Sequence, residues 1–254
     1  MEKRFEEYCI IASRISGMTV EAIKEIVKYV EDKEFDDSVE VIMSSIYIKQ
    51  WYDSIKESGV NADYSLYSDQ YYIAAGWLSY KKWSSKHVKV IADNKQQWGD
   101  VKTIIDFGCG IGYSTLDFAV AFPEARIIGT NLKGIQLELC KEICKDMKNV
   151  EFFTDEQFAE LPTCDIAFCS EYFEHFYEPT VHLREILLQT RPRYMMCANA
   201  FRPLAVGHFN KYLIEGKIED HEVTKTMFNN ILFDSYHPVE HNGFNNRPNI
   251  WERL

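Results

Sequence analysis

Two patterns of apolar residues follow one another along the chain. Over roughly the first 95 residues, apolar positions recur three or four apart, which predicts amphipathic helices, as at Val20, Ile23, Val27 and Val30. The polar run 94–100 predicts a connector. We therefore expect two units, a helical segment over residues 1–95 and a different one over residues 101–254.

From residue 101 on, short β-branched runs alternate with amphipathic stretches. Strands are predicted at 103–107, 125–129, 150–153, 164–169 and 194–198. Helices are predicted between them, at 114–122, 135–147 and 180–188. Such alternation is typical of βαβ units and a mostly parallel sheet. A helix at 221–233 and an antiparallel hairpin formed by 236–241 and 249–253 would complete seven strands.

Composition narrows the classes of protein. The 254 residues carry 28 basic and 39 acidic side chains, so the net charge of −11 disfavours broad electrostatic capture of nucleic acid. No apolar run approaches the ~20 residues that span a bilayer, so we expect no membrane segment. Seven cysteines without a CxxC pair argue against a disulfide framework and a structural zinc site. We expect no metal, and reduced thiols in a cytoplasmic compartment.

The first predicted strand runs into a glycine-rich turn, formed by Gly108, Gly110 and Gly112, just before a predicted helix. Glycines there allow the backbone to approach a ligand closely. The dinucleotide fingerprint GxGxxG would need a third glycine where Tyr113 stands. Asp106 also places a carboxylate before the turn, which suits a cationic sulfonium better than a pyrophosphate. These features favour S-adenosylmethionine over a nicotinamide cofactor.

The stretch IIDFGCGIGYSTLDFA resembles the first motif of class I S-adenosylmethionine-dependent methyltransferases. Segments 128–132, 153–156 and 165–176 stand in register with later motifs of that family, so the resemblance covers roughly residues 101–200. It implies an α/β fold that is Rossmann-like and doubly wound, here with an N-terminal helical cap. It also implies S-adenosylmethionine as the cofactor and methyl transfer as the activity.

The resemblance further implies a set of cofactor-binding residues along the carboxyl edge of the sheet: Asp106, Gly108, Gly110, Gly112, Asn131, Leu132, Asp155, Glu156, Ser170 and Glu171. Asn131 departs from the family, which usually has Asp or Glu at the ribose hydroxyls. An amide can accept one hydrogen bond and donate another, but without the strength of a carboxylate. Asp155 stands where the family meets the adenine amino group.

Three residues near the predicted sheet edge are candidates for catalysis: Glu174, His175 and His208. Any of them could accept a proton from a hydroxyl or amine acceptor. His175 could instead cap the following turn. Since a sulfonium is already a strong electrophile, orientation alone can supply much of the rate, and we expect direct in-line transfer without a covalent intermediate.

The acceptor is predicted by elimination. Ser170-Glu171-Tyr172-Phe173 lacks the prolines typical of amino-methylating DNA enzymes, and the chain has no Pro-Cys dipeptide for cytosine-C5 chemistry. We expect a small-molecule acceptor methylated at oxygen, nitrogen or carbon. A methyltransferase of macromolecules and a catalytically inert cofactor-binding subunit remain open alternatives, and the oligomeric state is left open.

Overall fold

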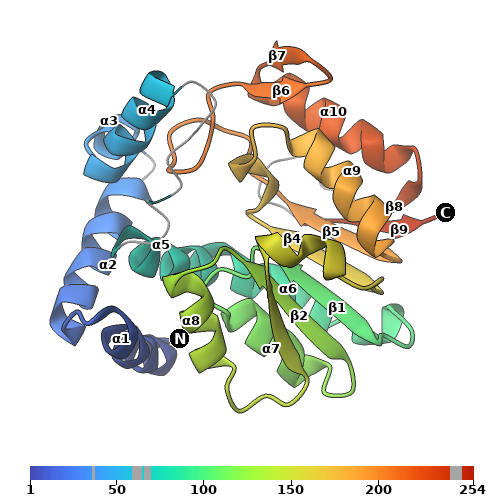
Figure 1. The fold of residues 1–254 in the computed structure, drawn as a ribbon, viewed down its shortest axis with the longest axis horizontal. Coiled ribbons are helices and arrows are strands. Elements are labelled where there is room, and N and C mark those ends of the chain that lie inside the picture. Colours follow the sequence, from blue (N-terminus) through green and yellow to red (C-terminus); the bar gives the residue numbers. More distant parts are fainter. Residues whose placement is uncertain (36–37, 59–64, 66–69, 241–247) are drawn as a thin grey trace.

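The fold is that of a computed structural model, which describes residues 1–35, 38–58, 65, 70–240 and 248–254. The described residues form a seven-stranded sheet of order β3-β2-β1-β4-β5-β9-β8 (Figure 1). Five strands are parallel: β1 (Thr103–Phe107), β2 (Arg126–Asn131), β3 (Val150–Thr154), β4 (Ile166–Ser170) and β5 (Tyr194–Ala198). The antiparallel strands are β8 (Tyr236–Glu240) and β9 (Asn249–Arg253). The predicted Rossmann-like, doubly wound α/β class and its closing hairpin are confirmed.

The order of strands reverses between β1 and β4, which are neighbours in the sheet. In open sheets of this kind ligands bind outside the carboxyl ends of the strands at such a reversal. Four helices connect the strands, namely α7 (Tyr113–Ala121), α8 (Ile135–Ile143), α9 (Pro179–Thr190) and α10 (His221–Phe233). The topology therefore places the ligand site beside the glycine-rich turn that follows β1.

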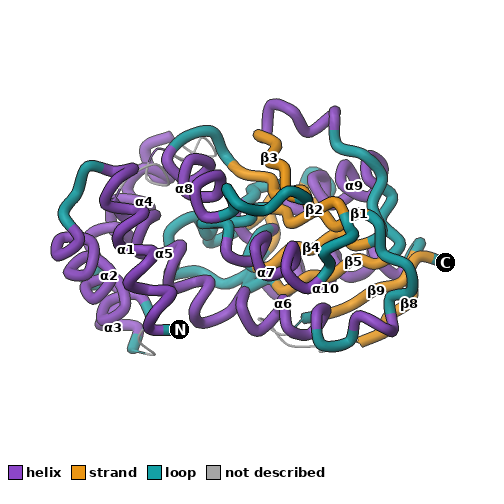
Figure 2. The backbone as a smooth tube through the Cα atoms, turned by 90° about the horizontal axis from the view of Figure 1, so that it is seen from below, coloured by secondary structure: helices purple, strands orange, loops and turns teal. Residues whose placement is uncertain are grey.

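The N-terminal part of the chain is helical, as predicted. It comprises α1 (Glu2–Ser16), α2 (Val20–Glu34), α3 (Val39–Met43), α4 (Ile46–Ser58), α5 (Gln70–Ser79), the π-turn η2 (Tyr80–Ser84), α6 (Ser85–Ala92) and the short 3₁₀ turn η3 (Lys95–Gln97). Helices α1 to α4 lie to one side of the sheet, and α6 lies against it beside α7 (Figures 1 and 2). We call residues 1–92 the cap. In the described part of the chain, no helix is both long enough and apolar enough to cross a bilayer.

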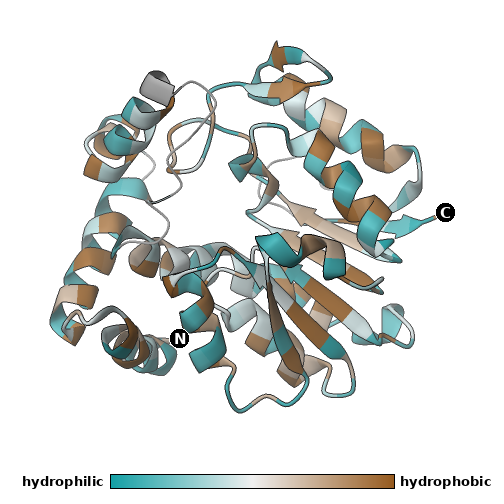
Figure 3. Ribbon diagram, viewed as in Figure 1, coloured by the Kyte–Doolittle hydropathy of each residue, from teal (hydrophilic) through white to brown (hydrophobic). Residues whose placement is uncertain are grey.

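The cap and the sheet share one hydrophobic core. Tyr8, Trp51 and Trp77 from the cap belong to the same buried cluster as Phe107 of β1 and Trp251 of β9. Figure 3 shows the central strands mostly in brown, whereas teal residues recur on the helices. The boundary predicted near residue 95 separates two patterns of sequence, but it does not separate two cores.

The helical spacing of Val39, Ile42, Ile46 and Trp51 predicts one helix that ends at Gly59, but the structure breaks it at Ser44 and Ser45 into α3 and α4. The Ser45 hydroxyl accepts hydrogen bonds from the backbone N–H groups of Tyr47 and Ile48, which caps the start of α4, and donates to the Glu34 carboxylate. Serine competes well for such end positions because its short side chain reaches the free N–H groups. The residues expected to cap or end this helix, Asp36, Asp37 and Gly59, lie outside the described residues.

A second helix, predicted from about Gln70 to Asp93, contains the π-turn η2 in its middle. Such turns are frequent at functional sites. The analysis also missed a small hairpin, β6 (Tyr212–Ile214) with β7 (Lys217–Glu219), because its strands are only three residues long. Tyr67 and the hairpin turn predicted at Asn242-Gly243 fall outside the described part of the chain.

Replacing Ser45 tests the cap of α4. Ser45→Ala should lower the free energy of unfolding by about 1–3 kcal/mol, because the substitution removes both the helix cap and the hydrogen bond to Glu34. Urea denaturation followed by circular dichroism measures the change. Ser44→Ala is the matched control, since the exposed Ser44 hydroxyl only donates to the Val41 carbonyl. Equal stability of the two variants would contradict the assignment.

Candidate functional site

A cavity of about 910 Å³ lies at the carboxyl edge of the sheet, under α5 and η2. Its wall includes the turn after β1, the ends of β2, β3 and β4, and the loop after β5. Residues from these five places that line it include Gly110, Asn131, Asp155, Glu171 and His208. The volume is at the upper end of the range for ligand pockets, roughly 300–1,000 Å³, which leaves room for a cofactor and an acceptor together.

The three glycines of the turn have different tasks. All three have positive φ, at 62°, 59° and 89°, a region that L side chains rarely adopt. A Cβ on Gly108 would come within 2.4 Å of the Tyr172 ring, and one on Gly112 within 2.8 Å of the Cys140 backbone. A Cβ on Gly110 would meet nothing closer than the Tyr72 hydroxyl, at 3.5 Å. Gly110 therefore faces the cavity, whereas Gly112 lets α7 pack on α8.

Asp106 sits beneath this turn and is almost fully buried. Its carboxylate accepts hydrogen bonds from Ser114 Oγ at 2.6 Å and Thr115 Oγ1 at 2.7 Å, both in the first turn of α7. Burial raises the pKa of Asp106 to about 7, although the two hydroxyls oppose this shift. The residue reaches the cavity wall and also ties β1 to α7 across the glycine turn.

Asn131 lines the cavity at the end of β2, but the protein itself uses its amide group. Nδ2 donates to the Gly110 carbonyl at 2.7 Å, and Oδ1 accepts from the Leu132 N–H at 2.9 Å. These bonds fix the glycine turn from below. The ribose hydroxyls stay the predicted partners of Asn131, and its hydrogen bond to the Gly110 carbonyl is one that a carboxylate could not donate.

Of the remaining predicted cofactor residues, some line the cavity and others do not. Leu132, Asp155, Ser170 and Glu171 line the cavity together with the residues described above. Gly112 and Glu156 are not part of its wall, so their predicted contact with the cofactor is not supported by their positions. Glu156 is exposed in the turn η4 (Asp155–Glu160), one residue beyond Asp155. The motif alone could not distinguish the two neighbouring carboxylates.

Ser170 joins the sheet edge to the cap. Its Oγ lies 2.8 Å from Nδ1 of His87 in α6 and 3.2 Å from Oγ of Ser84 in η2. His87 is buried and was missed by the sequence analysis, because a single histidine within an amphipathic helix carries no local signal. The cap is also joined to α7, because the Tyr80 hydroxyl in η2 donates a hydrogen bond to the Asp117 carboxylate at 2.6 Å. The cap is thus fixed on both sides of the cavity.

Two further cavity residues follow β4. Glu171 has a φ of 53°, a strained value for a non-glycine residue. Burial, and then the neighbouring Glu174, raise its pKa well above the usual range. Tyr172 covers Gly108, and its hydroxyl lies 2.8 Å from Nε2 of His182 in α9. None of these contacts could be read from the sequence.

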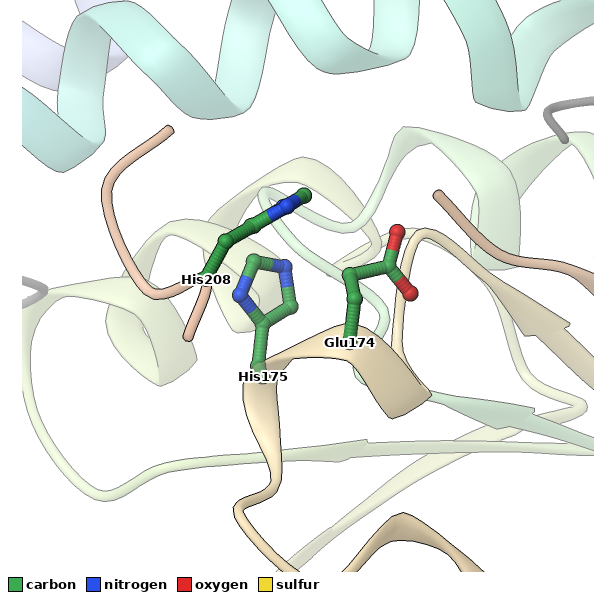
Figure 4. Close-up of side chains that lie close together, drawn as sticks. All are labelled: Glu174, His175 and His208. Atoms are coloured by element: carbon green, nitrogen blue, oxygen red, sulfur yellow. The ribbon is translucent and has the colours of Figure 1, made fainter. Parts of the chain in front are cut away.

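The structure brings together the three residues that were predicted to act in catalysis (Figure 4). Glu174 and His175 come from the turn η5 (Phe173–His175), and His208 comes from the loop after β5. One potential ligand atom from each of the three side chains lies within 4.8 Å of the other two. Both histidines line the cavity, whereas Glu174 is fully buried behind them. We call these residues the Glu174 cluster.

Burial keeps both histidines of the cluster neutral. It lowers the pKa of His175 to about 4 and that of His208 to about 3, because a buried imidazolium loses its hydration. Backbone carbonyls partly oppose these shifts; that of Arg202 lies 2.8 Å from Nδ1 of His208. At neutral pH the cluster thus carries no histidine charge.

A carboxylate of the cap, Glu34, reaches the cavity wall from the end of α2. It accepts hydrogen bonds from Ser45 and from the Tyr71 hydroxyl at 2.8 Å. Burial raises the pKa of Glu34 to about 7, although both hydroxyls lower it. The sequence carries no local signal for this carboxylate, because its partners Ser45 and Tyr71 lie elsewhere in the chain.

The raised pKa of Glu34 makes stability depend on pH. The folded protein binds this proton more tightly than the unfolded chain, so the contribution is complete below about pH 4.5 and is lost as pH rises through 7. Its size is about 1.4 kcal/mol for each unit of pKa difference. Urea denaturation at pH 5 and pH 8 should show a smaller fall for Glu34→Gln than for the parent. Glu31→Gln, on the exposed face of the same helix, should behave like the parent.

Asn131→Asp tests the role of the amide. A carboxylate at the ribose hydroxyls would by itself keep or strengthen cofactor affinity, but the contacts of Asn131 predict the reverse. A carboxylate would lose the donor to Gly110 and face the carbonyl oxygen instead, so affinity for S-adenosylhomocysteine should fall about tenfold or more. Calorimetry measures this, with Asn149→Asp, an amide that bonds backbone carbonyls beyond the cavity wall, as the control. A gain in affinity would support the ribose role.

The cavity fits the cofactor that the resemblance implies. Gly110 presents backbone to open space that a Cβ would occupy. Asp155 lies at the wall beyond β3, where an exocyclic amine could donate to it, and Ser170 lies beyond β4. A cationic sulfonium also suits a wall that carries the carboxyl groups of Asp106 and Glu171.

Solved structures resemble this one in fold. A protein of Nostoc punctiforme described as an O-methyltransferase matches 83% of this chain and 70% of its own, with 12% identity and a TM-score of 0.55. The mitomycin 7-O-methyltransferase MmcR matches 84% of this chain and 70% of its own, with 14% identity and a TM-score of 0.57. At these identities the likeness concerns the fold alone.

Sequence comparisons support the family directly. Malonyl-[acyl-carrier protein] O-methyltransferase of Halalkalibacterium halodurans is 23% identical over 130 residues, which are 48% of each chain, so the match spans about half of that relative. The profile of the family described as "Methyltransferase domain" matches residues 99–242, more than half of this chain. The chain belongs to this family, within the class I S-adenosylmethionine-dependent methyltransferases, and its cofactor is S-adenosylmethionine.

Proposed function

We propose that this protein transfers a methyl group from S-adenosylmethionine to a small-molecule acceptor, which binds between the cap and the loops after β4 and β5. One observation carries the proposal: a single cavity joins the glycine turn to the Glu174 cluster and to the cap. A site for the cofactor and a site for an acceptor therefore share one space. The acceptor atom, whether oxygen, nitrogen or carbon, is left to the assay.

The chain's own residues bind and orient the two reactants. The backbone at Gly108 and Gly110 would hold the cofactor, Asp155 would accept from its adenine amine, and Ser170 would face its methionine end. When bound, the cofactor supplies an electrophilic methyl group on sulfur. Holding donor and acceptor in line can by itself supply several kcal/mol of the barrier reduction, roughly 7–11 kcal/mol in ideal cases.

The acceptor end of the cavity is rich in aromatic side chains. Phe35, Tyr71 and Trp83 line it from the cap. Lys82, whose ammonium lies over the rings of Phe35 and Trp83, adds a positive charge. Such a wall suits a flat or apolar molecule with a few polar groups. This composition favours a small molecule over an extended polymer.

Two alternatives remain distinguishable. The relative from Halalkalibacterium halodurans is named for an acceptor on a carrier protein, so a carrier-bound acceptor is the macromolecular alternative. An inert cofactor-binding subunit is the other. A radiolabelled methyl-donor assay over a panel of free metabolites and carrier-bound acyl groups separates all three. Transfer to free metabolites supports the proposal, and transfer to carrier-bound groups alone, or none in spite of cofactor binding, contradicts it.

Gly110→Val tests the cofactor site. The side chain would enter the cavity, so we expect affinity for S-adenosylhomocysteine to fall at least about 100-fold while the protein stays folded. Gly216→Val is a matched control, since Gly216 also has positive φ, at 79°, but lies in the β6–β7 turn with nothing within 4 Å of its Cβ position. Calorimetry measures affinity, and circular dichroism checks the fold. Parent-like affinity in Gly110→Val would refute the cofactor site.

A further inference from the structure

The Glu174 cluster contains a buried polar atom that its surroundings do not satisfy. Glu174 is fully buried, and its Oε1 accepts a hydrogen bond from the Ala200 N–H at 2.9 Å. Among the described residues, no N–H or hydroxyl group donates to its Oε2, and the neighbouring side chain is the carboxyl group of Glu171. An unsatisfied carboxylate oxygen away from water is costly; its explanations include an unseen water, a bound ion and a proton shared with a neighbouring carboxyl group.

The side chains near this oxygen are metal ligands by type. His208 lies with Nδ1 2.8 Å from the Arg202 carbonyl, so Nδ1 carries the proton and Nε2 keeps its lone pair. Metal-binding histidines commonly have this arrangement, in which one ring nitrogen donates to a carbonyl and the other binds the ion. The His175 ring lies edge-on to that of His208, with centroids 5.0 Å apart. Figure 4 shows the two rings beside the Glu174 carboxylate.

We propose that Glu174, His175 and His208 bind one divalent transition-metal ion at the acceptor end of the cavity. Two imidazoles and one carboxylate suit Zn²⁺, Co²⁺, Ni²⁺ or Fe²⁺ better than Mg²⁺ or Ca²⁺, which prefer oxygen ligands. Three protein ligands leave a position open toward the cavity, as in catalytic sites. The sequence analysis expected no metal, because His208 is separated from the other two ligands by a strand and a helix and no spacing motif links them.

Binding would draw the three side chains together. Ligand atoms about 2.1 Å from a tetrahedral ion lie about 3.4 Å from one another, which is closer than the 4.8 Å span of the cluster. Rotation of the Glu174 side chain, release of one of the hydrogen bonds that the His175 ring makes with the Gly207 and Glu171 backbone, and a small shift of the loop that carries His208 would close this gap. The nearby titratable groups are the Arg202 guanidinium and the Glu171 carboxyl, whose pKa is raised by burial well above its usual range, and both line the cavity.

The proposal rests on the proposed function only for the role of the ion, which would contact the acceptor. Binding itself can be tested without turnover. The alternative is that the same residues accept a proton from the acceptor, as the sequence analysis expected. The two alternatives make opposite predictions for Co²⁺ binding and for chelation.

The first experiment is a Co²⁺ titration of protein dialysed against EDTA. We expect visible absorption bands that saturate at one ion per chain. Glu174→Gln keeps an acceptor for Ala200 and should weaken Co²⁺ binding by at least about tenfold, as should His208→Asn. His221→Asn, at an exposed histidine outside the cavity, should bind like the parent. Absence of the bands in folded parent protein, or bands unchanged in both cluster variants, would overturn the proposal.

Calorimetry with S-adenosylhomocysteine on the same EDTA-treated protein keeps the two hypotheses separate. If the protein binds S-adenosylhomocysteine but not Co²⁺, the metal site fails and the proposed function stands. If it binds Co²⁺ but not S-adenosylhomocysteine, the metal site stands and the proposed function fails. Once an acceptor is known, turnover that EDTA leaves unchanged but His208→Asn abolishes would assign the cluster to proton transfer and would also overturn the metal site.

Discussion

The hydrogen bond from Asn131 Nδ2 to the Gly110 carbonyl holds the part of the backbone on which the site depends. A turn with three positive-φ glycines has few internal restraints, since glycine loses more conformational freedom on folding than any other residue. Here the amide fixes the turn from β2, Asp106 fixes the helix that follows it, and Gly112 locks that helix against α8. The cofactor therefore meets a surface that is already in place.

Hydrogen bonds also join the edge of the sheet to the cap. Ser170, at the end of β4, hydrogen-bonds to both Ser84 and His87, so the helix over the cavity is joined to the strand beneath it. Because the cap also contributes Trp51 and Trp77 to the common core, it behaves as a fixed wall and not as a separate lid. The residues of this wall, among them Phe35, Tyr71 and Trp83, then set the shape of the space left for an acceptor.

The sequence predicted the fold well because parallel strands are buried on both faces and read as short apolar runs. The sequence pattern predicted the closing hairpin and most helices. It did not predict the helix break at Ser45, where the contacts of a single side chain determine where α4 begins. For the site too, local patterns in the sequence were informative and single distant contacts were not. Residues next to the glycine motif were found, whereas His87 and Glu34 were missed because their partners are distant in the chain. Asn131 lies on the cavity wall, and its hydrogen bond to the Gly110 carbonyl was missed, since a motif shows a position and not its contacts.

The π-turn η2 sets the rotation of everything that follows it in the cap. It holds one residue more than an α-helical turn, and each residue rotates a helix by about 100°. If the same five residues, Tyr80–Ser84, formed a regular α-helix instead, α6 would be turned by about that angle. His87 would then point away from Ser170, while Tyr80 kept its contact with Asp117. The π-turn thus sets the rotation of α6 about its axis and brings His87 to Ser170 at the edge of the sheet.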